Sequence, residues 1–195
     1  MLTHFIDIKA IPQAEMLQTT VVAHIWQVLH RHLPSINQAN DPVAIAFPAY
    51  GQGGTLGGII RLLGSLDALD HLITQIEALR SYALISEPKP VPAKPKGYAR
   101  FVRKHYKGAS HVRQLKKRAA ERGEPWSQEH EEAVVKKYKS KRRVPFVLLK
   151  SSSTAQANMR LHVDVQPAAA FIQGKFTGYG LSDTNTEAVA SVPVF

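Results

Sequence analysis

Residues 22–34 read VAHIWQVLHRHLP, and they set the pattern for the first half of the chain. Their apolar side chains recur at helical spacing, in the order Val22, Ile25, Trp26, Leu29 and Leu33. This spacing predicts an amphipathic helix with one buried face. We expect the helix to end at Pro34, because proline has no amide hydrogen with which to continue the helical hydrogen bonds.

The segments around this helix predict a β-α-β-β-α-β order. Strands are expected where apolar residues alternate with polar ones or form short runs, at residues 4–11, 43–47, 59–63 and 82–85. The glycine-rich segment 51–58 indicates a hairpin loop, since it lacks the Gly-Lys-Ser/Thr ending of a phosphate-binding loop. A second helix is expected after Ser65, which suits an N-cap. The order is that of the ferredoxin-like arrangement, a fold that serves many functions.

Residues 86–97 hold four prolines in twelve positions, a density that prevents a helix or a regular strand ladder. We therefore expect an extended linker between one domain at 1–85 and another at 98–195. In the second domain, a helix is predicted from Ser110, as its N-cap, to Arg122, with Gly123 just beyond its end. Another helix is expected over 128–139. The remaining predicted elements are strands, at 144–149, 159–165, 171–176 and 192–195. The expected class is α+β.

The basic charge of the chain is concentrated in one segment. Of 195 residues, 25 are Lys or Arg and 15 are Asp or Glu, a net charge of +10. Residues 94–143 contain 17 of the bases and 5 of the acids, so this segment carries the whole excess. A basic segment on a near-neutral remainder predicts an anionic partner, and the second domain is therefore expected to be an α/β RNA-binding domain with a basic helix.

The helix predicted at 110–122 places cations on both flanks of a narrow apolar stripe. Such a helix can contact phosphates of two strands that line one groove, while its stripe packs on the protein. The candidate RNA-binding side chains are Arg113, Lys116, Lys117, Arg118 and Arg122. The alternative is a solvated surface helix, although such helices usually alternate the sign of their charges.

Aromatic rings alternate with basic residues just before this helix, over residues 98–107. Rings and guanidinium groups together can stack on the bases of single-stranded or looped RNA. The alternative is a β-strand with one side buried, which the alternation alone cannot distinguish from a stacking surface.

Several function classes are excluded by composition. The chain has no cysteine, which rules out disulfides, zinc–thiolate or iron–sulfur sites and thiol catalysis. The histidines and carboxylates show no metal-ligand spacing and no hydrolase motif, so we expect neither a metal nor a cofactor. No apolar run reaches the length of a membrane span, and the first residues do not resemble a signal peptide. We expect a cytoplasmic protein with no membrane partner.

Histidine is the side chain left for proton transfer near neutral pH. The first predicted helix carries three, His24, His30 and His32. Of these, His30 borders the apolar stripe, one turn after Trp26, and is placed to face a cleft at the edge of a packed interface. The alternative for any one of them is a structural histidine whose ring is hydrogen-bonded in the fold.

Motifs along nearly the whole chain are similar to those of one known family. They are Val28-Leu-His30, the proline-rich linker, the basic helix, Pro145-Phe-Val-Leu-Leu-Lys-Ser151-Ser-Ser-Thr, Arg160-Leu, Phe176-Thr-Gly-Tyr179-Gly-Leu-Ser182 and Val192-Pro-Val-Phe. With these, the chain resembles the CRISPR-associated endoribonucleases of the subtype I-F systems (Csy-type), which cut the repeat transcript into guide RNAs.

The resemblance implies a cleavage chemistry. In this family a ribose 2′-hydroxyl attacks the adjacent phosphate without a metal, leaving a 2′,3′-cyclic phosphate and a 5′-hydroxyl. At the matching positions, His30 is expected to transfer the proton, Ser151 to orient the ribose and Tyr179 to position the histidine. Because three serines follow one another, Ser153 is the alternative to Ser151.

The resemblance also implies the substrate and the partners. They are a CRISPR repeat stem-loop, cut at the 3′ base of its stem and kept as product, and the other subunits of a type I-F surveillance complex, with one protein monomer on each RNA. Arg103 and His105 match two positions that contact bases near the stem end. Better-known members have glutamine in place of His105, and a stacking phenylalanine in place of Met159.

Three other functions remain open on this reasoning. The first is a non-catalytic hairpin-binding subunit of the same complex. The second is a ferredoxin-like ribosomal or RNA-chaperone protein, which would bind many hairpins with a steep salt dependence. The third, DNA binding, is less favoured because no helix-turn-helix pattern is present.

Overall fold

The computed structural model describes residues 1–38, 41–106, 109–139, 144–150 and 159–195. The chain forms two compact units, Met1–Arg103 with Pro145–Phe195, and Lys104–Val144. This division differs from the expected boundary at residues 86–97, because strands from both sides of that segment share one core. Phe47 packs edge-on against Phe101 at 5.5 Å between ring centroids. The assignment of domains at 1–85 and 98–195 stays a prediction.

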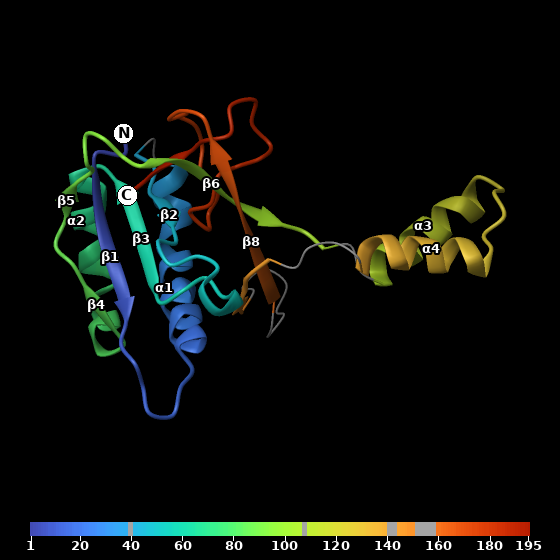
Figure 1. Ribbon diagram of the computed structural model, residues 1–195, viewed down its shortest axis with the longest axis horizontal. Helices are drawn as coiled ribbons and strands as arrows, with labels where there is room; N and C mark the ends of the chain where they lie inside the picture. Colours follow the sequence, from blue (N-terminus) through green and yellow to red (C-terminus); the bar gives the residue numbers. More distant parts are fainter. Residues whose placement is uncertain (39–40, 107–108, 140–143, 151–158) are drawn as a thin grey trace. The chain divides into compact units, whose positions relative to one another are not determined.

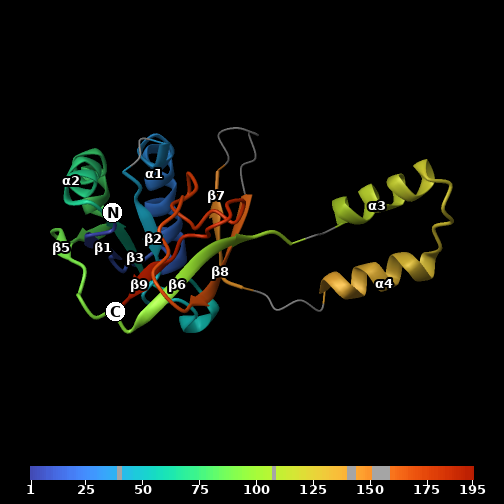
Figure 2. The same ribbon diagram turned by 90° about the horizontal axis from the view of Figure 1, so that it is seen from above.

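The first sheet is antiparallel and carries two helices on one face (Figures 1 and 2). Its elements, in chain order, are β1 (His4–Ala10), α1 (Gln18–Gln38), β2 (Ala44–Ala46), β3 (Ile59–Gly64), α2 (Leu66–Gln75) and β4 (Ala83–Ile85). The strands lie in the order β2-β3-β1-β4. Short 3₁₀ turns, η1 (Gln52–Gly54) and η2 (Glu77–Ser81), follow β2 and α2. The β-α-β-β-α-β order of elements, the hairpin between β2 and β3, and the Ser65 N-cap, which accepts from the Ala68 amide at 3.1 Å, are confirmed.

Two expectations for this half need correction. Helix α1 does not end at Pro34 but continues through it to Gln38. Proline costs the helix one hydrogen bond, and the last turn is held instead by Asn37, whose side chain bonds to the Val43 amide and the Thr177 carbonyl, each at 2.8 Å. The proline-rich segment is not wholly a linker either, because β5 (Lys89–Pro90) pairs with β1 at the sheet edge.

The second sheet has four antiparallel strands in the order β7-β8-β6-β9. They are β6 (Gly97–Lys104), β7 (Phe146–Leu149), β8 (Met159–Ala168) and β9 (Val192–Val194). The strand alternative for the basic-aromatic segment is thus confirmed, and Phe101 is buried in the core. The strand expected at 171–176 is wrong. The backbone of residues 171–176 bonds partly to side chains: the Ile172 amide donates to Ser191 Oγ at 2.8 Å. Only an isolated bridge joins Phe176 to Ser182.

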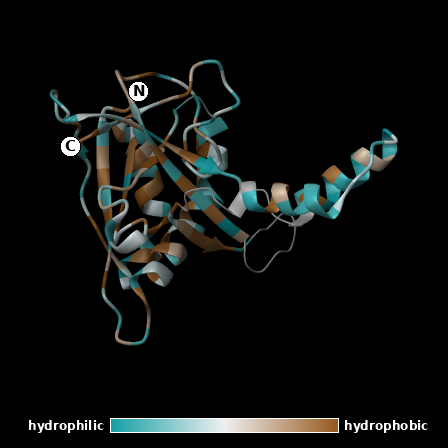
Figure 3. Ribbon diagram, turned by 45° about the vertical axis from the view of Figure 1, so that its right-hand side comes forward, coloured by the Kyte–Doolittle hydropathy of each residue, from teal (hydrophilic) through white to brown (hydrophobic). Residues whose placement is uncertain are grey.

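The unit Lys104–Val144 is a helical hairpin of α3 (Ala109–Glu121) and α4 (Gln128–Lys139). Helix α3 begins at Ala109, so Ser110 lies within it rather than before it. Gly123 ends it as expected, with φ +69° and a bond from the Glu124 amide to the Ala119 carbonyl of 2.9 Å. Most of this hairpin is hydrophilic, whereas apolar residues concentrate on the strands and α1 of the other unit (Figure 3).

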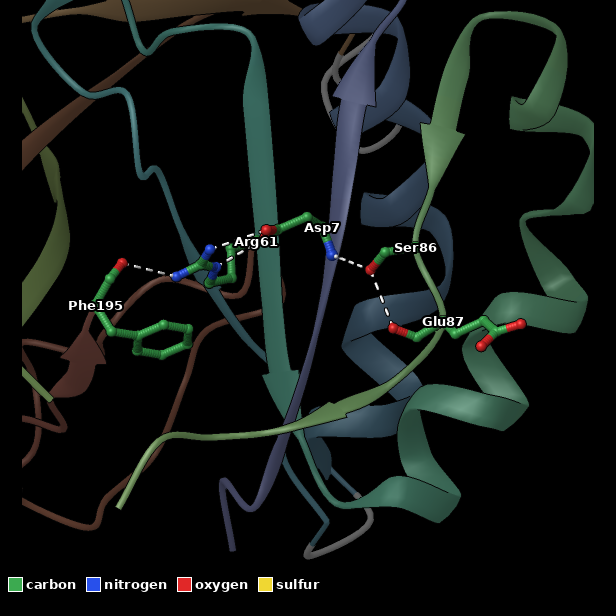
Figure 4. A network of polar contacts seen from close by, with 5 residues as sticks. All are labelled: Asp7, Arg61, Ser86, Glu87 and Phe195. Atoms are coloured by element: carbon green, nitrogen blue, oxygen red, sulfur yellow. Dashed lines mark hydrogen bonds and ion pairs between the residues drawn. The ribbon is translucent and has the colours of Figure 1, made fainter. Parts of the chain in front are cut away.

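A polar network ties the last residue of the chain to the first sheet (Figure 4). Arg61 on β3 donates to both carboxylate oxygens of Asp7 on β1, at 2.7 and 2.9 Å, and to the Phe195 carbonyl at 3.2 Å. Its guanidinium carbon also lies 4.6 Å from the ring centroid of Phe5 and 4.1 Å from that of Phe195. The Asp7 amide donates to Ser86 Oγ at 2.9 Å, which brings the segment after β4 into the same network.

We predict that Arg61→Met lowers the free energy of unfolding by about 3 kcal/mol, because it leaves the Asp7 carboxylate without its cation. The estimate lies at the low end for such a loss because the Asp7 side chain is 29% exposed. Urea denaturation of the wild type and the variant measures the difference. A loss below about 1 kcal/mol, the value of an exposed ion pair, would contradict the prediction.

Candidate functional site

A tight turn at residues 177–180 lies against α1. The turn is closed by a bond of 2.8 Å from the Gly180 amide to the Thr177 carbonyl. Its four consecutive carbonyl oxygens also accept bonds from outside the turn: Thr177 from Asn37 Nδ2 at 2.8 Å, Gly178 from His30 Nδ1 at 2.8 Å, Tyr179 from Trp26 Nε1 at 3.1 Å and Gly180 from the Ile45 amide at 2.7 Å. The turn is therefore held along its whole length.

Glycine is required at the end of this turn. Gly180 has φ +73°, and a Cβ built there would lie 2.7 Å from Ile45 Cγ1. Both the left-handed backbone and the close approach to β2 exclude a larger residue without movement. The Gly-Tyr-Gly sequence thus places the side chain of Tyr179 on a turn whose backbone has little conformational freedom.

His30 and Tyr179 are in direct contact. Their rings stack with centroids 4.0 Å apart and planes inclined by 10°. Because the Gly178 carbonyl can only accept, His30 Nδ1 is the donor in their bond, and the neutral ring then has its lone pair on Nε2. The two residues whose roles came from the family resemblance are thus brought together by a contact between distant parts of the chain.

Two more of the expected residues lie beside this pair. The guanidinium carbon of Arg103, on β6, is 5.4 Å from the Tyr179 ring centroid. Arg103 Nη2 also donates to Met159 Sδ, on β8, at 3.7 Å, a weak bond as expected for a thioether. Met159 is half-buried and packs against the core, so the structure groups His30, Tyr179, Arg103 and Met159.

The other expected residues lie elsewhere or cannot be placed. His105 is exposed and belongs to the unit Lys104–Val144. Ser151 and its alternative Ser153 fall outside the described residues. The residue before them, Lys150, donates its backbone N–H to Gln27 Oε1 at 2.6 Å. Gln27 lies on α1 one turn before His30, so the residue that follows β7 is hydrogen-bonded to the helix that carries His30.

The cations predicted to bind RNA are exposed side chains, on α3 or, for Arg122, directly after its last residue: Arg113, Lys116, Lys117, Arg118 and Arg122. Three of them contact carboxylates of their own unit. Lys117 lies 3.8 Å from Glu121 one turn on, Arg122 lies 2.9 Å from Glu124, and Lys116 lies 3.4 Å from Glu131 of α4. Exposed pairs of this kind contribute little free energy. The pair of Lys116 and Glu131 differs from the other two, because it links α3 to α4.

Glu131 of α4 bonds both to α3 and to the segment between the two helices. The indole of Trp126 donates to Glu131 Oε2 at 3.1 Å, and Lys116 Nζ donates to the same oxygen at 3.4 Å. The bond from Trp126, followed by that from Lys116 and the charge of Lys116, holds the pKa of Glu131 below its ordinary value of 4.5. The charged carboxylate is therefore favoured when the hairpin is folded.

This lowered pKa predicts a pH dependence. A carboxyl group whose pKa is depressed by folding stabilises the fold above its unfolded value of 4.5, and that contribution is lost as the pH falls through the folded value. We expect the fluorescence of Trp126 to change in this acidic range, and we expect Glu131→Gln to remove that change. The other tryptophan, Trp26, is buried in the other unit and contributes the same background fluorescence to the wild type and to the variant. Identical acid titrations would contradict the prediction.

Three contributors to the site were missed by the sequence analysis. Trp26 was expected only as a core residue, and Asn37 and Gln27 were not singled out at all. A signal was available for Trp26, which lies four residues before His30 and so shares one face of the helix with it, whereas Asn37 lies beyond Pro34, where the helix was expected to end. Their partners are backbone carbonyl and amide groups, and because nearly every residue has both, the sequence does not show which of them are used.

In the described parts of the chain, no three His, Asp or Glu side chains are grouped as a metal site requires. In these same ranges, no helix is both long enough and apolar enough to cross a membrane.

Comparison with known proteins assigns the family. The sequence model of the CRISPR-associated protein family Cas_Csy4 matches residues 5–195. The chain belongs to this family. It is 29% identical over 183 residues to the CRISPR-associated endonuclease Cas6/Csy4 of Pseudomonas aeruginosa (strain UCBPP-PA14), covering 92% of this chain and 95% of that one. To the protein of the same name from Escherichia coli (strain UTI89 / UPEC) it is 28% identical over 187 residues, covering 94% and 97%.

Proposed function

We propose that this chain is a metal-independent endoribonuclease that binds a CRISPR repeat hairpin and cuts precursor RNA at the 3′ base of the stem. Its family membership and the endonuclease names of its relatives support the class of enzyme. The observation that carries the chemistry is the stacked pair of His30 and Tyr179, in which the Gly178 carbonyl holds Nδ1. That arrangement leaves Nε2 of a half-buried histidine for proton transfer.

The proposed step uses a nucleophile that belongs to the RNA. The ribose 2′-oxygen forms a bond to the adjacent phosphorus as the bond from phosphorus to the 5′-oxygen breaks. The 2′-hydroxyl gives its proton to His30 Nε2, one proton is returned to the leaving 5′-oxygen so that it ends as a hydroxyl, and the phosphate closes into a 2′,3′-cyclic ester. The protein has only to hold the groups in line and move a proton, so no metal is needed to generate the nucleophile. Ser151 would orient the ribose and Tyr179 would fix the imidazole.

RNA binding would use both units. Arg103, close to the Tyr179 ring, has donors suited to the O6 and N7 edge of a guanine near the stem end. His105 would contact a second base, and Met159 would lie near the terminal base pair. The exposed cations of α3 would contact phosphates of the stem. The family relation supports this assignment, as does the concentration of basic residues in 94–143.

Further parts of the proposal concern the fold and the setting. The strand order β2-β3-β1-β4 under two helices supports a ferredoxin-like arrangement for residues 1–85. We further propose that the protein acts in the cytoplasm as a monomer on its RNA, stays on its product and joins a type I-F surveillance complex.

One experiment tests the activity. The protein is incubated in EDTA with the cognate repeat hairpin, beside a copy with a single 2′-deoxy nucleotide upstream of the scissile phosphate. We expect only the all-ribose RNA to be cut, with a cyclic phosphate on its new end. Tight binding of both RNAs with cleavage of neither would replace the enzyme by a non-catalytic hairpin-binding subunit. Cleavage that requires a divalent metal would overturn the mechanism.

A further inference from the structure

The side chain of Asn37 joins three separate segments. Asn37 lies in the last turn of α1, beyond Pro34, and is half-buried. Its Nδ2 donates to the Thr177 carbonyl and its Oδ1 accepts from the Val43 amide, each at 2.8 Å. A carbonyl only accepts and an amide N–H only donates, so these two partners allow a single orientation of the carboxamide. Asn37 therefore connects the end of α1, the approach to β2 and the start of the 177–180 turn.

The same turn is bonded to α1 at two further points. Trp26 and His30 donate to the carbonyls of Tyr179 and Gly178, so three α1 side chains hold three consecutive residues of the turn. Trp26 is fully buried, and its loss would affect the core. His30 is the proposed proton-transfer residue. Asn37 is the one member of the three that belongs neither to the fully buried core nor to the proposed chemistry.

We propose that Asn37 is a positioning residue for His30, and this inference rests on the proposed function. By holding the Thr177 carbonyl, Asn37 keeps the next carbonyl, that of Gly178, on His30 Nδ1 and the next ring, that of Tyr179, stacked on the imidazole. It thereby fixes both the orientation and the tautomer of His30, with the hydrogen on Nδ1 and the lone pair on Nε2. Asn37 itself acts only through the turn.

Asn37→Asp is the sharpest test because it is nearly isosteric. A carboxylate still accepts from the Val43 amide, but it presents an oxygen in place of an N–H to the Thr177 carbonyl. We expect single-turnover cleavage of the repeat hairpin to slow by between about 10-fold and about 100-fold, the cost of misplacing a catalytic group, with the affinity for the hairpin unchanged. Asn37→Ala, which loses both bonds, should be at least as slow.

Asn185→Asp is the matched control, since it makes the same change of charge on an exposed side chain that bonds to Asp183. It should cleave at the wild-type rate. Nitrogen NMR of isotope-labelled histidine provides a readout that a merely structural role would not move. The His30 signals, assigned by their absence from His30→Ala, should show hydrogen on Nδ1 in the wild type and a mixture of tautomers in Asn37→Asp.

The outcomes separate this inference from the proposed function. If Asn37→Asp cleaves at the wild-type rate with an unchanged His30 tautomer, Asn37 is not a positioning residue. If both Asn37 variants are unfolded, Asn37 serves the fold and the inference also fails. If the wild type cuts no RNA, the proposed function fails, while the tautomer comparison still decides whether Asn37 controls His30.

Discussion

The His30→Ala variant should cleave the repeat hairpin about 10²-fold to 10⁴-fold more slowly than the wild type, the usual contribution of a positioned proton-transfer group. Its affinity for the hairpin should be unchanged, because the proposed phosphate contacts lie on α3. The residue is half-buried and stacks on Tyr179, so its loss should spare the fully buried core. Single-turnover rates at saturating protein, beside direct measurement of Kd, separate the chemical step from binding.

Two further variants make this result specific. In His30→Asn, the carboxamide can still donate to the Gly178 carbonyl but cannot take up a proton, so the turn should persist while cleavage stays slow. His24→Ala removes an exposed imidazole from the same helix, where it contacts Tyr82 at 4.7 Å between ring centroids, and should cleave normally. Wild-type cleavage by His30→Asn would show that the imidazole transfers no proton.

Replacing four cations of α3 and its C-terminal end by glutamine should have the largest effect on binding. The variant Arg113→Gln, Lys117→Gln, Arg118→Gln, Arg122→Gln should bind the hairpin roughly 100-fold more weakly at low salt. Its plot of log affinity against log salt concentration should be less steep by about 3 to 4, since each phosphate contact contributes about 0.9 to the slope. Lys116 is kept because it contacts Glu131 of α4, and glutamine preserves helix propensity.

The matched control removes the same charge from the other unit. It carries four exposed cations changed to glutamine, at Lys9, Arg80, Lys89 and Lys175. We expect its affinity and salt dependence to stay close to those of the wild type. If the two variants lose affinity equally, the net charge of the protein attracts the RNA and α3 is no specific phosphate-binding element.

Much of the first half of the fold could be predicted from local patterns. The alternation at β1, the stripe of α1 and the Ser65 cap of α2 each depend on neighbours within a few residues, and each is confirmed. Prediction failed at places where distant contacts outweigh local preference. Helix α1 passes Pro34 because Asn37 is bonded beyond it, and residues 171–176 form no strand because they bond to the segment near Ser191.

Less of the candidate site than of the fold could be predicted from the sequence. His30 was singled out from its place at the border of the stripe, Tyr179 and Met159 from family resemblance alone, and Arg103 from that resemblance and from the basic-aromatic pattern of 98–107. That these four lie together follows from packing of the second sheet and the 177–180 turn against α1. Their catalytic and RNA-binding roles stay predictions.

The sequence by itself determined the α+β class, the concentration of positive charge in 94–143 and the family. These properties depend only on residue type and on short-range spacing along the chain. Only the tertiary structure decided which nitrogen of His30 is bonded, which ring covers it and which side chains hold the turn. The physical reason is that the hydrogen bonds among those contacts end on backbone carbonyls of residues 177–179, and every residue has a carbonyl. Their use becomes visible only when the folded chain brings α1 and the turn within hydrogen-bonding distance.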